Sequence, residues 1–261
     1  DEGDGVETND IMSRAEKFET VLPAKEIGVL CASADVQADR IEVLVNGYSA
    51  NQTWIVGFQI FYGSPTSESL WNEVEEYLKT TWPHPSGNDL RITRSFIDSG
   101  YETGAVYNFC KKLEALGVRA IKGVGGINRA EVGRPTKNNT ARCNVFPLGV
   151  NTLKTQILAR LKIDDPSNSG FINFPDFLDE EFFLQLTSER LIKKYVKGIP
   201  RMEFKQLRPR NEALDLMVYN LAAFRSLNAN MAIIQKKLAE IRKSETKRLQ
   251  QKRPRSWATN W

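Results

Sequence analysis

The chain has 261 residues, a formal net charge of +4 and the composition of a globular protein, enough for one large domain or two small ones. No apolar run reaches the ~18 residues that a membrane span needs, and no secretory signal opens the chain. Three scattered cysteines exclude a disulfide framework and a cysteine zinc site and favour a reducing compartment. A single histidine, His84, lies in a loop between two prolines, so histidine-based catalysis is not supported.

The first segment is acidic, contains glycine and is poor in large apolar residues. We therefore expect residues 1–24 to be a linker from an upstream domain that this chain lacks. A short helix is expected over residues 11–20 and should end before Pro23.

Three β-like runs follow, over residues 27–34, 41–48 and 53–62, and predict an antiparallel meander. Asp35 stands at the carboxyl end of the first run, and Asp39 lies in the same turn. A carboxylate at that position suits a divalent metal, but it also suits an ordinary turn.

An amphipathic helix is predicted over residues 67–78, and a fourth strand over residues 91–97 ends directly at Asp98. A helix over residues 101–116 and a strand over residues 118–124, which contains Lys122, complete a strand–helix–strand unit. Such a unit implies a right-handed parallel crossover.

The segment 123–139 is rich in glycine and in cationic residues, and predicts a mobile loop whose Arg129, Arg134 and Lys137 face phosphate groups. It lacks the spacing of a phosphate-binding loop, and so does the rest of the chain. We therefore do not expect ATP hydrolysis.

Further along, a strand is expected over residues 143–148, a helix over 151–161, a β-like segment over 171–174 and a helix over 179–188. Two more strands, 191–196 and 202–206, predict a β-hairpin. Its cations could track a DNA backbone, or could simply be a charged exposed surface; they are Lys193, Lys194, Lys197, Arg201 and Lys205.

The strongest helical pattern covers residues 211–227, and Asp215 lies at the edge of its apolar stripe. Burying that carboxylate requires a partner, which a metal ion, Arg208 or Arg210 could provide. The last segment, 231–261, is predicted to be a basic helical tail, because residues 235–255 contain nine Lys or Arg and two Glu. Such a tail suits nucleic acid or an acidic partner, or is a solvated end.

The order of these elements is that of a ribonuclease H-like α/β fold, a mixed sheet of three antiparallel and then parallel strands, flanked by helices, with an added hairpin. In this fold the first and fourth strands are neighbours, so Asp35 and Asp98 should lie side by side and a late helix should bring Asp215 to them. Converging carboxylates repel one another unless cations neutralise them, and oxygen ligands select Mg²⁺ or Mn²⁺. Two such ions can support phosphodiester hydrolysis without histidine.

Five segments resemble the nuclease domain of the large terminase subunit of tailed bacteriophages, of the lambda-like type. They are residues 34–40 (ADVQADR), 97–100 (IDSG), 121–123 (IKG), 171–175 (FINFP) and 210–215 (RNEALD), and the last is the most specific. Their order and spacing match over roughly residues 25–228, so we expect the nuclease domain to span residues 25–230.

The resemblance implies a metal-dependent endonuclease that cuts double-stranded concatemeric viral DNA during packaging, with Asp35, Asp98 and Asp215 as metal ligands for two Mg²⁺ or Mn²⁺ ions. Asp39, Lys122 and Glu212 fall in matching segments and are expected to support these ligands, and Lys122 could contact the scissile phosphate. The implied partners are DNA, the small terminase subunit and the portal of the procapsid, on which the tail would dock, in the host cytoplasm. The resemblance also implies that residues 1–24 connect to an ATPase domain that is missing from this chain. No membrane is implied. Two alternatives remain open, a non-catalytic module that docks on DNA or the portal, and a transposase- or resolvase-type nuclease.

Overall fold

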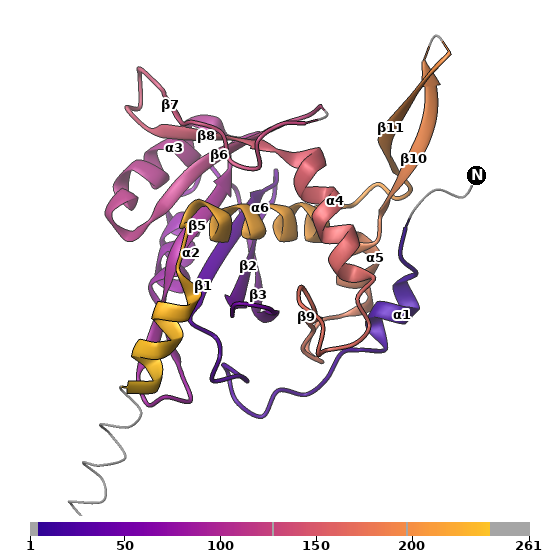
Figure 1. The fold of residues 1–261 in the computed structure, drawn as a ribbon. Helices are drawn as coiled ribbons and strands as arrows, with labels where there is room; N and C mark the ends of the chain where they lie inside the picture. Colours follow the sequence, from indigo (N-terminus) through magenta and orange to yellow (C-terminus); the bar gives the residue numbers. More distant parts are fainter. Residues whose placement is uncertain (1–4, 127, 197, 241–261) are drawn as a thin grey trace, which may run out of the picture.

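A computed structural model describes residues 5–126, 128–196 and 198–240. Its centre is a nine-stranded mixed sheet in the order β7-β8-β6-β5-β1-β2-β3-β9, with β4 paired to β5 (Figure 1). The strands of this sheet are β1 (Val29–Val36), β2 (Arg40–Tyr48), β3 (Thr53–Tyr62), β4 (Thr81–Pro83), β5 (Asp89–Asp98), β6 (Val118–Val124), β7 (Thr136–Lys137), β8 (Asn144–Gly149) and β9 (Ile172–Asn173).

The direction of the strands confirms the predicted ribonuclease H-like class. Strands β1, β2 and β3 form the antiparallel meander, whereas β5 lies parallel to β1, β6 parallel to β5 and β8 parallel to β6. Every residue of β1 is buried, because helices cover both faces of the sheet at this strand. The first strand of the chain is therefore the centre of the sheet.

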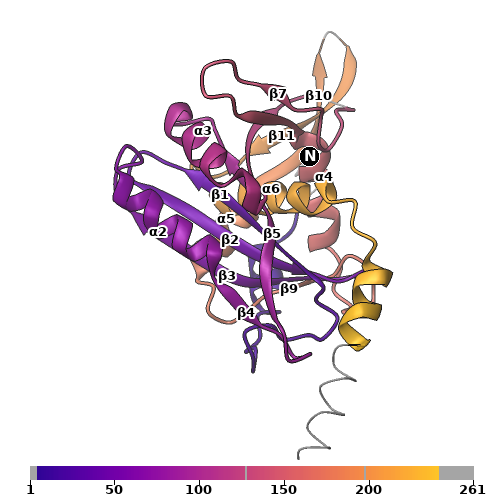
Figure 2. The same cartoon turned by 90° about the vertical axis from the view of Figure 1, so that its left-hand side faces the viewer.

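Helices pack on both faces of the sheet and create two separate hydrophobic cores (Figure 2). One core contains residues of α2 and α3, and the other contains residues of α4, α5 and α6. The helices are α1 (Thr8–Met12), α2 (Glu68–Lys79), α3 (Thr103–Lys112), the short 3₁₀ helix η1 (Glu114–Leu116), α4 (Val150–Leu161), α5 (Glu180–Leu186) and α6 (Glu212–Ser226).

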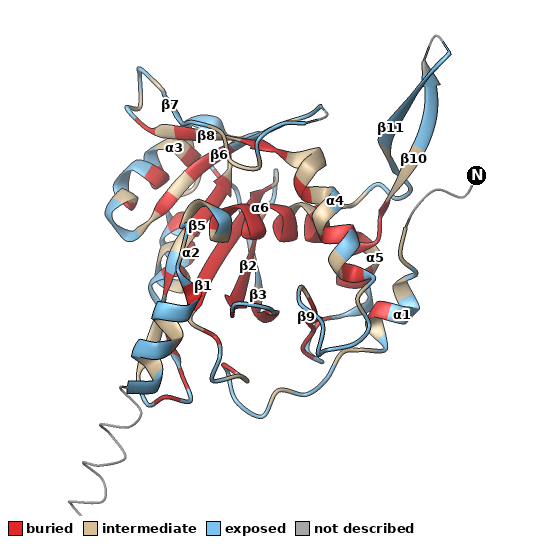
Figure 3. Ribbon diagram, viewed as in Figure 1, coloured by how far each residue is buried: buried red, intermediate tan, exposed pale blue. Residues whose placement is uncertain are grey.

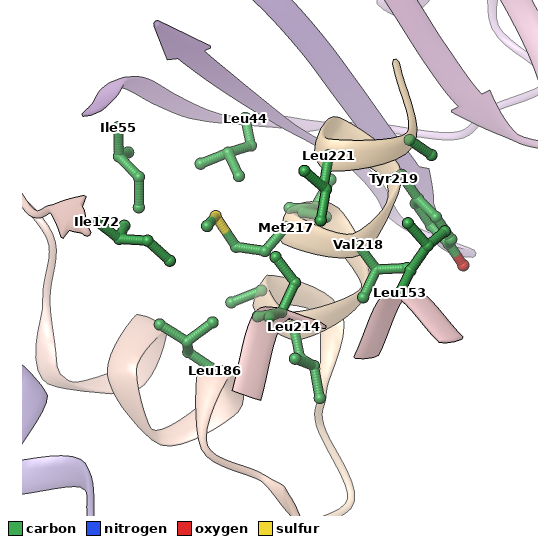
Figure 4. Packing of buried hydrophobic residues seen from close by; sticks show 14 of the residues in the cluster. Leu44, Ile55, Leu153, Ile172, Leu186, Leu214, Met217, Val218, Tyr219 and Leu221 are labelled. Carbon is green, nitrogen blue, oxygen red and sulfur yellow. The ribbon is translucent and has the colours of Figure 1, made fainter. Parts of the chain in front are cut away.

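Helix α6 is buried along most of its length (Figure 3), although its sequence predicts a single apolar stripe. The difference arises because α6 lies between the sheet and helices α4 and α5. Met217 contributes to the cluster that Ile55 and Ile172 share, while Val218 and Tyr219 lie beside Leu153 of α4 (Figure 4). Helix α6 is therefore held by the sheet on one side and by helices α4 and α5 on the other.

Several local predictions needed correction. The first helix is α1 rather than residues 11–20, and residues 5–24 pack on the body: Ile11 and Leu22 are fully buried, and Arg14 donates to the carbonyls of Leu161 and Ile163. The helix predicted over 101–116 divides into α3 and η1. The 3₁₀ helix η1 ends at Gly117, whose φ of +84° favours glycine. A Cβ at this position would also collide with the Thr93 carbonyl oxygen.

Strands β10 (Glu189–Val196) and β11 (Ile199–Gln206) confirm the predicted hairpin, which projects from the body (Figure 1). At the other end of the chain, residues 231–240 are helical, and Gln235 donates to the carbonyl of Glu26. The remainder of the predicted tail, residues 241–261, and Lys197 lie outside the described residues. No helix in the described part of the chain is both long and apolar enough to cross a membrane.

Candidate active site

Asp35 and Asp98 lie on neighbouring parallel strands at the same edge of the sheet. Ala34 of β1 is in register with Ile97 of β5. The residues that follow them, Asp35 and Asp98, therefore lie beside each other. Since side chains alternate between faces, and Ser33 and Phe96 contact the α6 side, both aspartates also lie on that side. The predicted pairing of these two strand ends is confirmed in the fold.

Helix α6 brings the third aspartate to this edge. Its backbone is held close to β1, because the Ser33 hydroxyl donates to the Leu216 carbonyl at 2.7 Å. Asn220, one and a half turns beyond Asp215, donates to the carbonyls of Cys31 and Leu44, both at 3.1 Å. Asp215 therefore stands in the first turn of a helix that is fixed to the two central strands.

The three carboxylates influence one another electrostatically. Burial raises the pKa of Asp35 to about 7; the hydrogen bond from Gln37 opposes this shift, whereas the charges of Asp98, Asp215 and Glu42 add to it. Burial also raises the pKa of Asp98 and of Asp215, in both cases against partly compensating partners. The edge thus concentrates negative charge in a poorly solvated place.

The donor chemistry of this edge fits a hard divalent cation. Mg²⁺ and Mn²⁺ prefer oxygen ligands such as carboxylates. A bound cation would also neutralise the negative charge that burial makes unfavourable here. Within the described residues no group of three or more Asp, Glu, His or Cys side chains is arranged to hold a single ion. Mg²⁺ usually takes one or two carboxylates and fills its remaining positions with water and phosphate oxygens, so a pair such as Asp35 and Asp98 is the relevant unit.

A partly buried cluster of ion pairs lies next to this site. Arg40 donates to Glu42 at 2.7 Å and to Glu212 at 3.0 Å, and Arg210 donates to Glu42 at 3.0 Å. One oxygen atom of Glu42 and one of Glu212 have no hydrogen-bond partner in the structure. Glu212 therefore serves an ion-pair cluster that joins β2 to α6, and it contacts Arg40 and Arg210 rather than the three aspartates.

Asp39 and Lys122, which are also expected to support the ligands, have different surroundings. The side chain of Asp39 is 71% exposed and forms an ion pair with Arg40 at 2.7 Å. Lys122 lies on the opposite face of the sheet, where it lines an open pocket of about 480 Å³ together with Tyr107 of α3 and Lys137. Its charge still lowers the pKa of Asp98.

The cations predicted to contact DNA occupy two projecting segments. Arg129, Arg134 and Lys137 are exposed in the connection between β6 and β8. The hairpin carries Lys193, Lys194 and Arg201; Lys194 forms an ion pair with Glu203, and Lys193 lies over the ring of Tyr195. Figures 1 and 2 show that both segments rise from the same end of the molecule.

Two neighbours of Asp215, Lys154 and Glu189, were not identified from the sequence, whereas Asn211 is expected there from its helical spacing. Lys154 of α4 lies 3.1 Å from Asp215 and 2.7 Å from Glu189, the first residue of β10, and the side chain of Asn211 contacts both acids. Burial alone would lower the pKa of Lys154, but Asp215 and Glu189 raise it above its usual value. The spacing of Asn211 and Asp215 on one helix turn predicts their contact, which is confirmed, but no local pattern connects Lys154 with Glu189.

The raised pKa of Asp35 predicts a stability effect. The folded protein holds this proton more tightly than the unfolded chain, so the stabilisation is complete below pH 4 and is lost as the pH rises to about 7. In EDTA at pH 8, Asp35→Asn should therefore raise the melting temperature by several degrees. The corresponding gain in the free energy of unfolding is at most about 4 kcal/mol. Differential scanning calorimetry measures this, and Asp39→Asn at the exposed position is the control. If Asp35→Asn melted at or below the temperature of the wild type, the charge of the ionised Asp35 carboxylate would not destabilise the fold as its raised pKa predicts.

The sequence matches one protein family and two curated relatives. Residues 1–238 match the family described as the endonuclease domain of the terminase large subunit gpA. The large terminase subunit of Escherichia phage lambda is 31% identical over 220 residues, covering 81% of this chain and 34% of that protein. The large terminase subunit of Enterobacteria phage P21 is 29% identical over 257 residues, covering 94% of this chain and 40% of that protein. The chain thus spans between a third and two fifths of the length of these curated relatives.

Among solved structures, the human cytomegalovirus terminase nuclease domain, soaked with Mn and inhibitor-bound, aligns with a TM-score of 0.46 and 13% identity, covering 88% of this chain and 98% of that one. A mutant nuclease domain of the large terminase subunit of bacterial virus Sf6, with manganese, aligns with a TM-score of 0.43 and 12% identity, covering 82% of this chain and 96% of that one. The strand order described above and the match over residues 1–238 therefore support one conclusion: this chain belongs to the family of the endonuclease domain of the phage terminase large subunit gpA.

Proposed function

We propose that this chain is a divalent-metal-dependent endonuclease that cuts double-stranded DNA, and that its substrate is the concatemeric viral genome during packaging. The observation that carries the proposal is the convergence of Asp35, Asp98 and Asp215 from β1, β5 and α6 at one edge of the sheet. Burial raises the pKa of all three carboxyl groups, and a bound cation would offset the cost of their negative charges.

Asp35, Asp98 and Asp215 would hold the ions, which we propose to be two Mg²⁺ or Mn²⁺. When bound, such ions supply activation of the attacking water and stabilisation of the departing 3′ oxygen. The chain itself supplies the rigid backbone: Asp35 and Asp98 end two paired strands, and Ser33 and Asn220 fix α6 against them. The small terminase subunit and the portal are proposed partners of the larger protein.

The direct test is cleavage of supercoiled plasmid DNA. The chain should convert it to nicked and linear forms with Mn²⁺ or Mg²⁺ and should leave it intact in EDTA. Wild-type protein that binds DNA but never cuts it under these conditions would support a docking module instead. Products joined into new strands would indicate a transposase-type enzyme.

The exposed cations of the β6–β8 connection should bind the DNA backbone. Arg129 and Arg134 form no ion pair among the described residues, so their charges are available to phosphates. Replacing both with Ala should reduce the slope of log binding constant against log salt by about 2, because each phosphate contact contributes ~0.9. Fluorescence anisotropy with a labelled duplex in EDTA measures the slope.

A double variant of Lys17 and Lys25, both exposed, removes the same total charge from a segment that precedes β1. It should leave the salt dependence close to that of the wild type. Equal slopes for the two double variants would show that the β6–β8 cations contribute only general positive charge.

A further inference from the structure

Four polar side chains form a closed ring around the end of α6 that carries Asp215. The Lys154 ammonium group lies 2.7 Å from Oε1 of Glu189 and 3.1 Å from Oδ1 of Asp215. The Asn211 amide donates to the same Glu189 oxygen at 2.9 Å and to Oδ2 of Asp215 at 3.1 Å. Glu189 is only 6% exposed, so its carboxylate depends on these two donors rather than on water.

This ring restrains the orientation of Asp215. Each of its two carboxylate oxygens accepts from a different donor, and both donors are held by one atom of Glu189. Rotation of the Asp215 carboxylate would break at least one of these contacts. The ring also retains a net negative charge, because two carboxylates share one ammonium group, so it can still attract a cation.

The position of Glu189 in the chain adds a second connection. It is the first residue of β10 and is in register with Gln206 at the end of β11. A backbone hydrogen bond of 2.7 Å from Leu207 to Ser188 closes the base of the hairpin beside it. The same hairpin that presents cations to solvent therefore ends, at its base, in the ring around Asp215.

We propose that Glu189 is a positioning residue that fixes the carboxylate of Asp215 for metal binding through Lys154 and Asn211. The inference rests on the proposed function, in which Asp215 is a metal ligand. Groups that orient a metal ligand in this way typically change metal affinity or activity by 10–100-fold when they are removed. Glu189 does not contact the DNA or the ion in this account, and its effect is exerted on Asp215.

The experiment compares three variants. Glu189→Ala removes the acceptor for both donors, Glu189→Gln keeps an oxygen acceptor without the charge, and Glu203→Ala removes an exposed acid from the same hairpin. Isothermal calorimetry without DNA measures Mn²⁺ affinity, and plasmid cleavage at saturating Mn²⁺ measures turnover. Glu189→Ala should weaken Mn²⁺ binding and slow cleavage, each by about 10–100-fold. Glu189→Gln should recover most of both, and Glu203→Ala should match the wild type.

Asn211→Ala is the second route to the same answer if Glu189→Ala fails to fold, and it should show a smaller loss of Mn²⁺ affinity. Folded Glu189→Ala or Asn211→Ala with wild-type Mn²⁺ affinity would overturn the inference. Equal losses in Glu189→Ala and Glu189→Gln would also overturn it, because charge and not orientation would then be responsible.

Failure of the proposed function gives a different result. A wild-type chain that binds Mn²⁺ but does not cut DNA refutes the endonuclease proposal, while the calorimetric comparison of the variants still decides the role of Glu189. A wild-type chain that binds no Mn²⁺ refutes both.

Discussion

Asp35→Asn is expected to reduce DNA cleavage by about 10³-fold or more, equivalent to ~4 kcal/mol of activation free energy, and to leave DNA binding intact. Asp35 is 7% exposed and lies in the central strand, beside Asp98. An amide in its place keeps the shape of the side chain but loses the charge that a divalent cation requires. Plasmid cleavage in Mn²⁺ and duplex binding in EDTA measure the two properties separately.

Asp39→Asn is the matched control for this experiment. It makes the same chemical change four residues later, at an exposed side chain that pairs with Arg40. Its cleavage rate should stay within a few-fold of the wild type. If Asp39→Asn abolished cleavage and Asp35→Asn did not, the metal-binding carboxylate of this turn would have been assigned to the wrong residue.

Asn220→Ala is expected to destabilise the fold by about 3 kcal/mol, because four polar contacts in the centre of the protein would be lost at once. Asn220 is fully buried and donates to the carbonyls of Cys31 and Leu44 and to the hydroxyl of Ser33. It also accepts from the hydroxyl of Tyr48 at 2.9 Å, and this buried hydroxyl would lose that acceptor. For a chain of this size the melting temperature should fall by roughly 6–12 °C.

Asn72→Ala provides the comparison, since Asn72 is an exposed residue within helix α2. The change should alter stability by no more than about 0.5 kcal/mol. Thermal unfolding followed by circular dichroism in EDTA compares the two variants. A loss of the same size in both would show that Asn220 does not tie α6 to β1 and β2 in the way its hydrogen bonds indicate.

The part of the site that lies on the sheet could be predicted from the sequence. Two apolar runs each end in an aspartate, at Asp35 and Asp98, and the order of the elements makes those strands neighbours. Strand periodicity and the order of the elements can be read from the sequence without knowing which distant residues come into contact. The helix that carries Asp215 was also evident, because its apolar residues recur at helical spacing.

The support around those residues could not be predicted. Lys154 and Glu189 lie 35 residues apart and meet only because α4 and the base of the hairpin both pack beside α6. Likewise, Lys122 matches the family segment, and alternation along β6 places its side chain on the α3 face, although its charge still acts on Asp98. Contacts of this kind depend on how layers pack, which single-sequence patterns do not encode.

Sequence also underestimated how much of the amino-terminal segment packs on the domain. Its low content of large apolar residues predicts a linker, but Ile11 and Leu22 are each fully buried. A single buried residue can anchor a short segment on the domain. It does not produce the repeated spacing of apolar residues by which a helix or strand is recognised in the sequence. That residues 1–24 connect to an upstream ATPase, and that residues 231–261 dock on a portal or DNA, remain predictions.

The central claim is that the edge formed by Asp35, Asp98 and Asp215 is a divalent-metal centre. Crystals soaked in Mn²⁺ and measured near the manganese absorption edge test it most directly, since anomalous scattering identifies the ion independently of any assay. We predict anomalous density contacted by carboxylate oxygens of Asp35 and Asp98, and a second peak contacted by Asp215. Anomalous density elsewhere on the protein, or none at this edge at millimolar Mn²⁺, would contradict the account.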